Sequence, residues 1–179
     1  MPDISIIVIS FILGIVLFLS AWDKVKDLKK TFVKIEAYRL LHKKIIKPFA
    51  IIATLLEFYL SFRLVSLNFN VVDGLMFTIL MSIFMIGIGI NLYVGNTEIS
   101  CGCGGVLEKD RLSINHIYRN AILIFTALLI AFSEFNIPTI PYLAFSGIIA
   151  IITVLISDMV TELQAQRLLL NKLLIKAKS

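Results

Sequence analysis

The sequence predicts an all-α protein, an integral membrane bundle of about five transmembrane helices with an amphipathic helix at the membrane surface. Hydrophobic residues make up 59% of its 179 residues and charged residues only 16%, and the mean hydropathy is +0.95. A soluble domain of this size could not bury so much apolar surface. The apolar residues also gather in separate runs that are long enough to cross a hydrocarbon core. We expect one polytopic domain over residues 1–179.

Five apolar runs are the predicted transmembrane spans. The first carries no charge and would be about 28 Å long as a helix, close to the thickness of a hydrocarbon core. Because the N-terminus lacks the basic start of a secretory signal peptide, this run is interpreted as a retained span. The second run is interrupted by Glu57 and Arg63, and two prolines set off the fifth. The spans are expected at residues 4–22, 48–67, 71–94, 117–135 and 140–160.

A lysine-rich segment, residues 23–47, follows the first span. Apolar residues recur in it at roughly helical spacing, with lysines between them, at Val25, Leu28, Phe32, Ile35 and Leu40. This pattern is typical of an amphipathic helix that lies among lipid headgroups. Docking of a partner protein on this segment is the alternative interpretation.

The distribution of basic residues predicts how the bundle faces. Nine of the 17 Lys and Arg residues lie in residues 23–47, and with five spans all of them except Arg63 fall on one side. The positive-inside rule places that side, with its basic loops and the C-terminal tail, in the cytosol. The charge therefore indicates contact with the lipid bilayer, and nucleic-acid binding is not expected because the charges lie beside membrane spans.

The chain has only two cysteines, Cys101 and Cys103, in a glycine-rich segment between the third and fourth spans. Thiol–disulfide exchange needs an accessible thiolate, a second sulfur nearby and room for an incoming disulfide. Gly102, Gly104 and Gly105 have no side chains, so a partner's backbone could approach closely. A disulfide within this short spacing would close a small ring and be easily reduced.

Other interpretations of the two cysteines stay open. They could be unreactive small residues in a turn, or form a permanent disulfide. They could also be soft ligands for Cu(I) or Zn(II) together with His116. Two sulfurs and one histidine at irregular spacing are a weak metal signature, so no metal site is predicted. His116 and the nearby Lys109 and Arg111 could instead lower the pKa of a thiol.

Polar residues within the spans are functional candidates because burying them in lipid is costly. Glu57 is expected in the middle of the second span. It could have a functional role, or it could be protonated or paired with Arg119 or Asn91 in a structural contact. Asn91 lies near the end of the third span and could cap it, bridge two helices or face the cysteine segment.

Several stretches resemble MauE-type proteins of the DoxX-like membrane superfamily. Residues 20–27 and 36–41 are similar to the first loop of that family, and Glu57 falls where the family has a glutamate. Residues 91–105 resemble its most specific signature, which runs from an asparagine to a Cys-Gly-Cys-Phe-Gly-like turn, and residues 114–120 match its next landmark. The resemblance covers roughly residues 15–130. The sequence departs from the family at Gly104, where an aromatic residue is usual, and in lacking a proline before Glu57.

The resemblance implies a four-helix DoxX-like core plus one further helix, and a role in thiol–disulfide chemistry with a thioredoxin-fold partner. Cys101 and Cys103 would be the catalytic residues of such an oxidoreductase. Glu57, Asn91 and Arg119, supported by Asn120, would form a polar cluster that positions the cysteine loop or handles a proton. A quinone acceptor is conceivable, although no residue argues for it specifically. The alternative function is a non-enzymatic accessory, immunity or ligand-binding membrane protein whose cysteines are structural or bind metal.

Overall fold

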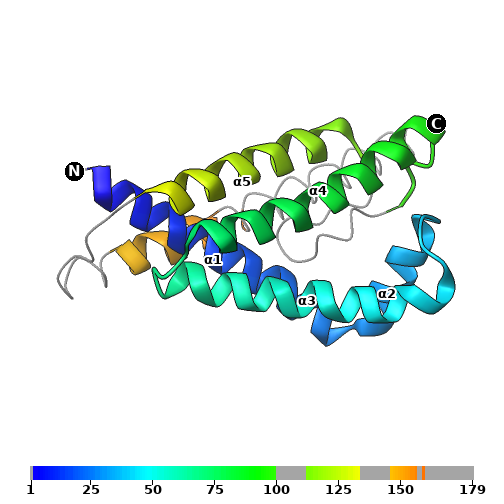
Figure 1. The fold of residues 1–179 in the computed structure, drawn as a ribbon, viewed down its shortest axis with the longest axis horizontal. Helices are drawn as coiled ribbons and strands as arrows, with labels where there is room; N and C mark the ends of the chain where they lie inside the picture. The colour runs from blue at the N-terminus through cyan, green and yellow to red at the C-terminus, as the bar shows by residue number, and fades with distance from the viewer. Residues whose placement is uncertain (1, 100–111, 134–145, 157–158, 160–179) are drawn as a thin grey trace, which may run out of the picture.

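The computed structural model describes residues 2–99, 112–133, 146–156 and 159, and the predicted all-helical class is confirmed (Figure 1). Four of the described helices are long and apolar enough to cross a membrane, namely α1, α3, α4 and α5. The fifth predicted span lies partly outside the described residues, and its described part, Ser146–Ile156, is a shorter apolar helix. The labelled helices are α1 (Pro2–Lys26), α2 (Leu28–Ala37), α3 (Lys43–Val65), α4 (Val71–Val94) and α5 (Ile114–Phe132).

Helices α1 and α3 pack against each other in antiparallel directions through small residues. The Ser10 hydroxyl donates to the carbonyl oxygen of Leu64 at 3.2 Å, and the Ser61 hydroxyl donates to that of Gly14 at 2.8 Å. A Cβ atom on Gly14 would lie 2.8 Å from Cγ2 of Val65, which is too close for van der Waals contact. Small residues at this interface therefore allow the two backbones to approach closely, as is common between helices in membranes.

The lysine-rich segment is divided differently from the prediction of one amphipathic helix over residues 23–47. Helix α1 continues to Lys26, and α2 begins after Asp27, whose carboxylate accepts a hydrogen bond from the Lys30 backbone N–H at 3.0 Å. After α2 the chain turns at Arg39, which has a φ of 54°, and α3 begins at Lys43, before the predicted start at residue 48. The spacing of apolar residues is helical throughout this segment and gives no sign of a break. The chain nevertheless leaves the helix at the N-cap Asp27 and at the left-handed turn of Arg39.

Helices α4 and α5 form the second closely packed pair. Gly74 makes this possible, because a Cβ atom there would lie 2.8 Å from Cβ of Ala131. Helix α4 begins with a reciprocal capping box between Asn70 and Asp73 and ends at Gly95, whose φ of 81° suits a glycine. Helices α3 and α4 touch each other much less than α1 touches α3 or α4 touches α5. The bundle is therefore two helix pairs that meet around a shared apolar core.

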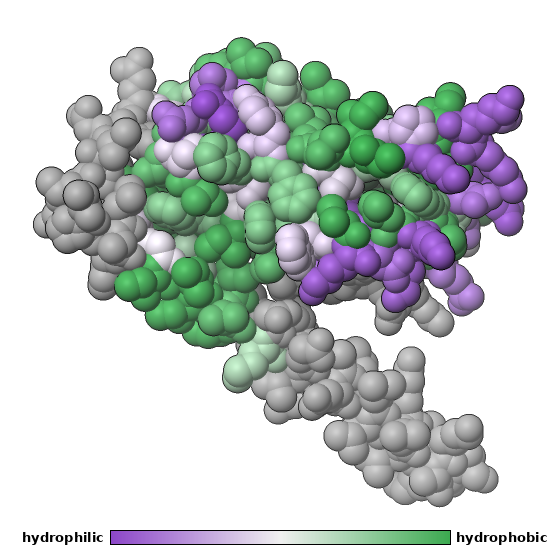
Figure 2. Space-filling view, turned by 90° about the horizontal axis from the view of Figure 1, so that it is seen from below, coloured by the Kyte–Doolittle hydropathy of each residue, from purple (hydrophilic) through white to green (hydrophobic). Residues whose placement is uncertain are grey.

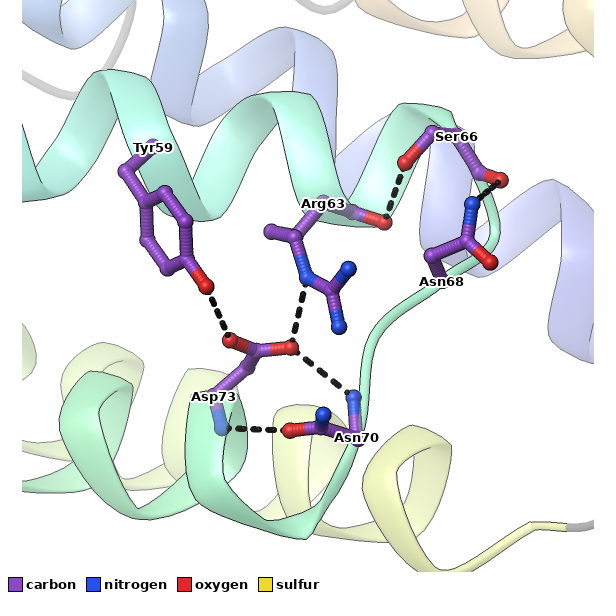
Figure 3. A network of polar contacts seen from close by, with 6 residues as sticks. All are labelled: Tyr59, Arg63, Ser66, Asn68, Asn70 and Asp73. Carbon is purple, nitrogen blue, oxygen red and sulfur yellow. Dashed lines mark hydrogen bonds and ion pairs between the residues drawn. The ribbon is translucent and has the colours of Figure 1, made fainter.

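A polar network joins the end of α3 to the start of α4 (Figure 3). The two carboxylate oxygens of Asp73 accept from the Tyr59 hydroxyl at 3.1 Å and from Nε of Arg63 at 2.9 Å. The second oxygen also accepts from the Asn70 backbone N–H at 3.0 Å. Asp73 is 2% exposed, and this set of donors compensates its burial. The network fixes the turn at the end of the bundle opposite α2 (Figure 1).

The surface matches a protein that is solvated by lipid along its sides. Figure 2 shows hydrophilic residues concentrated at one end of the molecule, while hydrophobic residues cover much of the remaining described surface. Large apolar side chains are exposed on every long helix, among them Phe18 on α1, Phe62 on α3, Ile86 on α4 and Phe125 on α5. Such a surface is unfavourable in water and favourable in a hydrocarbon core.

Candidate functional site

Lys24 and Glu57 form an ion pair inside the bundle, between the last turn of α1 and the middle of α3. Their side chains are 7% and 1% exposed, and the ammonium also lies 5.2 Å from the ring centroid of Phe84. Ser20, one turn before Lys24, donates a hydrogen bond to the other oxygen of Glu57 at 3.4 Å. Lys24 was not among the partners considered for Glu57 from the sequence, where Arg119 and Asn91 were the alternatives for a structural contact.

The helical register of α1 explains why a lysine lies inside the bundle. Leu13, Leu17, Ser20 and Lys24 follow one another at spacings of four, three and four residues, and all of them are buried. The same pattern is present in the sequence and could have indicated that Lys24 faces the core. It was obscured because Lys24 stands at the edge of a lysine-rich segment whose other lysines are exposed or half-buried.

A buried ion pair is poor evidence of added stability. Removing two charges from water costs several kcal/mol per ion, and an apolar pair of similar volume is often at least as stable. Because stability does not explain them, charged groups within membrane spans are functional candidates. Here the structure identifies both charged residues of the pair, Lys24 and Glu57. The pair makes the region around Lys24 and Glu57 the first candidate site in the described part of the chain.

Arg119 and Asn120, on α5, lie on the other side of the same carboxylate. Together with Glu57 and Ser20 they line a small cavity of about 20 Å³ between α1, α3, α4 and α5. The side-chain nitrogen of Asn120 is buried there without a hydrogen-bond partner among the described residues. Most of the lining is apolar, although four polar residues contribute to it, and a cavity of this size has room for one water molecule. The structure thus brings three of the sequence-predicted site residues, Glu57, Arg119 and Asn120, around one small cavity.

Asn91 belongs to a different network. Its side-chain nitrogen donates to the carbonyl oxygens of Gly87 at 3.0 Å and Tyr38 at 3.2 Å. Asn96 donates to the side-chain oxygen of Asn91 at 2.8 Å and to the carbonyl oxygen of Ala37 at 3.3 Å. These two asparagines fasten the end of α4 to the chain just after α2.

The cysteine motif, with Cys101, Cys103 and its glycines Gly102, Gly104 and Gly105, lies outside the described residues. The residues on either side of it are described. The backbone N–H of Leu112 donates to the carbonyl oxygen of Thr97 at 3.0 Å, so the two flanks of the motif are joined. Ile99 and Leu112 also pack with Ile88 in a small apolar cluster, which Tyr38 contacts.

His116, which could have contributed to a metal site, lies buried in the first turn of α5. Its Nδ1 accepts a hydrogen bond from the backbone N–H of Ser113 at 3.0 Å, and the ring thereby caps the start of the helix. Within residues 2–99, 112–133, 146–156 and 159, no group of three or more His, Cys, Asp and Glu side chains is arranged to hold a metal ion.

A larger cavity, of about 420 Å³, lies between α2, α3 and α4 on the other side of Lys24. The lysine is the one ionisable residue besides Tyr38 among its described lining residues, and most of the others are aliphatic or aromatic. Neither Lys24 nor Tyr38 was among the site residues predicted from the sequence. Lys24 thus has Glu57 on one side and an apolar, ligand-sized space on the other.

Comparisons with known proteins identified a family. The family model described as methylamine utilisation protein MauE matches residues 2–133, which include α1 to α5 and the cysteine motif. Neither the curated proteins nor the solved structures gave a match.

Proposed function

Because the chain belongs to the MauE family of membrane proteins, we propose that it is a multi-pass thiol–disulfide exchange protein with a thioredoxin-fold partner. Cys101 and Cys103 are the reacting residues of this proposal. The observation that carries it is the hydrogen bond between Leu112 and Thr97, which joins the two flanks of the cysteine motif at one end of the bundle. In this proposal the two cysteines between these flanks react with a partner outside the hydrocarbon core.

The proposed reaction is a two-step exchange. A thiolate of the partner attacks one sulfur of a Cys101–Cys103 disulfide and forms a mixed disulfide, while the other cysteine leaves as a thiolate. The second thiolate of the partner then attacks the mixed disulfide and releases the cysteine bound in it. Two electrons pass from the partner to the protein, and the two protons lost by the partner thiols are balanced by two that the reduced protein can take up. The reverse sequence reduces the partner.

The flanks of the motif support a common location for the cysteine segment and the basic residues. Asn96, just after α4, donates a hydrogen bond to the carbonyl oxygen of Ala37 at the end of the lysine-rich α2, and α2 lies at one end of the bundle (Figure 1). By the positive-inside rule this end is cytosolic. We therefore propose that the partner approaches from the cytosol, and that Asn91 and Asn96 are positioning residues for the segment.

Mixed-disulfide trapping tests the exchange. The Cys101→Ser and Cys103→Ser variants are prepared in detergent, and the partner is a thioredoxin variant whose resolving cysteine is replaced by serine. The remaining cysteine of one protein is first converted to a mixed disulfide with a small thiol, and the two proteins are then combined. At least one single variant is expected to form a disulfide-linked complex with thioredoxin, which dithiothreitol separates by reducing the disulfide. The Cys101→Ser/Cys103→Ser double variant is the matched control and is expected to form none.

A redox titration separates this function from a structural role of the cysteines. The fraction of alkylated cysteine is measured by mass spectrometry across a series of ratios of reduced to oxidised dithiothreitol. Cys101 and Cys103 are expected to interconvert between dithiol and disulfide as a two-electron couple. Thiols that stay reduced or oxidised throughout, together with no trapped complex, would contradict the proposal. Labelling with a membrane-impermeant maleimide from each side of sealed vesicles tests the cytosolic location.

A further inference from the structure

We propose that the cavity beside Lys24 binds a neutral, largely apolar molecule whose carbonyl oxygen accepts a hydrogen bond from the lysine ammonium. Such a site goes beyond the cysteine chemistry, and it would exist whether or not the cysteines exchange with a partner. It lies between α2, α3 and α4, where the two helix pairs of the bundle diverge.

The size and the lining of the cavity suit a small ligand. Its volume of about 420 Å³ is within the range of ligand pockets in proteins, and such pockets are mostly apolar with a few convergent polar groups. Lys24 supplies a polar group at the wall that α1 contributes. The aliphatic and aromatic residues that surround the remaining space include Ile35, Leu41, Phe49, Ala53, Phe84 and Ile90.

The two threonine hydroxyl groups of the lining do not compete with Lys24 as donors. A threonine hydroxyl has one proton. The hydroxyl of Thr54 donates to the carbonyl oxygen of Ala50 at 2.8 Å, and that of Thr31 lies 3.2 Å from the carbonyl oxygen of Asp27. The ammonium has three N–H donors, and in the described part of the chain one of them goes to Glu57. Donors of Lys24 are therefore available to a ligand.

The charges select the chemistry of the ligand's polar group. Lys24 and Glu57 together carry no net charge, so an anionic ligand would add an unbalanced negative charge to a low-dielectric region. A pure hydrocarbon would leave the ammonium donors desolvated without a partner, which is also unfavourable. A carbonyl oxygen avoids both costs, because it accepts a hydrogen bond and brings no charge.

Part of the cavity lining is exposed at the surface of the bundle. Ile83, Ile86 and Ile90 line the cavity from α4, and they are 44%, 62% and 43% exposed. A molecule dissolved in the bilayer could enter past them and leave an alkyl tail among the lipids. Isoprenoid quinones and acyl esters share this chemistry, a carbonyl on an apolar body, and the experiment distinguishes the two sources.

Binding is measured with protein in nanodiscs of an ether-linked phosphatidylcholine, which supplies no ester carbonyl of its own. The three probes are decylubiquinone, methyl palmitate and decylbenzene, which carry a quinone carbonyl, an ester carbonyl and no carbonyl. At least one carbonyl probe is expected to bind saturably, with a Kd at least about tenfold lower than that of decylbenzene. The carbonyl probe that binds more tightly shows whether the natural ligand is a quinone or an acyl ester.

Two variants test the location of the site. Ala53→Phe fills the cavity, and Lys24→Met/Glu57→Gln removes the donor without leaving an unpaired charge. Each is expected to raise the Kd of the tighter probe at least about tenfold. Leu55→Phe is the matched control on the same helix, because Leu55 is 62% exposed and lines neither cavity. It is expected to leave the Kd within about twofold, as is the Cys101→Ser/Cys103→Ser variant.

Three results would overturn the site. The first is that neither carbonyl probe binds saturably, and the second is that decylbenzene binds as tightly as both. The third is that Ala53→Phe, shown to be folded by its thermal unfolding, binds like the wild-type protein. Because the variant without cysteines must bind normally, failure of the cavity and failure of the cysteine exchange are distinguishable.

Discussion

Lys24 on α1 and Glu57 on α3 form an ion pair that is almost completely shielded from the surroundings of the bundle. The pair has a small cavity of about 20 Å³ on one side and a larger apolar cavity of about 420 Å³ on the other. It therefore connects residues contributed by all five labelled helices. Its energetics give the first prediction.

Removing one member of the pair should destabilise the protein far more than removing both. Lys24→Met leaves the Glu57 carboxylate buried without its counter-charge, and the expected loss in the free energy of unfolding is about 3–5 kcal/mol. Lys24→Met/Glu57→Gln leaves no uncompensated charge and should lose clearly less. Unfolding in detergent by chemical denaturant measures both.

The exposed pair of Lys43 and Glu36, with an N···O distance of 3.0 Å, is the matched control for this cycle. Its side chains are 85% and 48% exposed, so breaking it should change the free energy of unfolding by less than about 1 kcal/mol. Equal effects for the two pairs would contradict the description of Lys24 and Glu57 as buried.

Gly14→Val should disrupt the contact between α1 and α3. The added Cβ atom would lie 2.8 Å from Cγ2 of Val65 and 3.3 Å from the carbonyl oxygen of Ser61, so the helices must move apart. Overpacking of this kind costs about 1–3 kcal/mol, which thermal unfolding in detergent detects. Gly89→Val is the control, because nothing lies within 4 Å of a Cβ atom there. A similar loss at both positions would attribute the effect to helix propensity and not to packing.

Asn91→Leu should loosen the base of the cysteine segment. The substitution removes the donor to Gly87 and Tyr38 and the acceptor for Asn96, and groups left buried without partners cost about 1–3 kcal/mol. We also expect the alkylation rates of the reduced cysteines to change. Asn68→Leu, at an exposed position, is the matched control. If both variants alkylate like the wild-type protein, Asn91 does not position the segment.

Asp27 should make the start of α2 sensitive to acid. The hydrogen bond from the Lys30 backbone N–H, with the nearby lysine charge, lowers the pKa of this carboxyl below its ordinary value. The charged form is thus favoured in the folded state. Its stabilisation is present above the ordinary aspartate pKa of 3.8 and is lost as the pH falls through the lower folded value.

Hydrogen exchange at the Lys30 amide, compared at each pH with the Asp27→Asn variant, measures this effect. Asparagine also caps helices but does not titrate in this range. Protection of the wild-type amide relative to the variant is expected to fall on acidification below about pH 4. A ratio that stays constant with pH would exclude a role for the Asp27 charge in capping α2.

Helix boundaries show where the sequence was informative and where it was not. The apolar runs predict the four long helices well, because a hydrophobic run of sufficient length is a local property of the chain. Helix α3 begins before the predicted span, because Lys43 to Lys47 were assigned to the amphipathic segment although they belong to the helix that contains Pro48. The break after Lys26 was also missed, because it depends on one side-chain cap at Asp27.

The candidate site was predicted in part. Glu57 stands out in the sequence because a carboxylate in an apolar run needs an explanation. The proximity of Arg119 and Asn120 to it was suggested by the polar cluster that the family resemblance implies. The ion pair of Glu57 with Lys24 and the apolar cavity were not foreseen, because both depend on how the helices are rotated and spaced.

The sequence by itself determined that this protein is a helical membrane protein and that its two cysteines lie together in a glycine-rich segment. Both follow from composition and from order along the chain, which need no knowledge of packing. Only the tertiary structure decided that Lys24 turns inward to Glu57, that Asn91 joins Tyr38 and Asn96, and that a cavity lies between α3 and α4. The physical reason is that these contacts depend on the register and rotation of helices far apart in sequence, which hydrophobic runs do not encode.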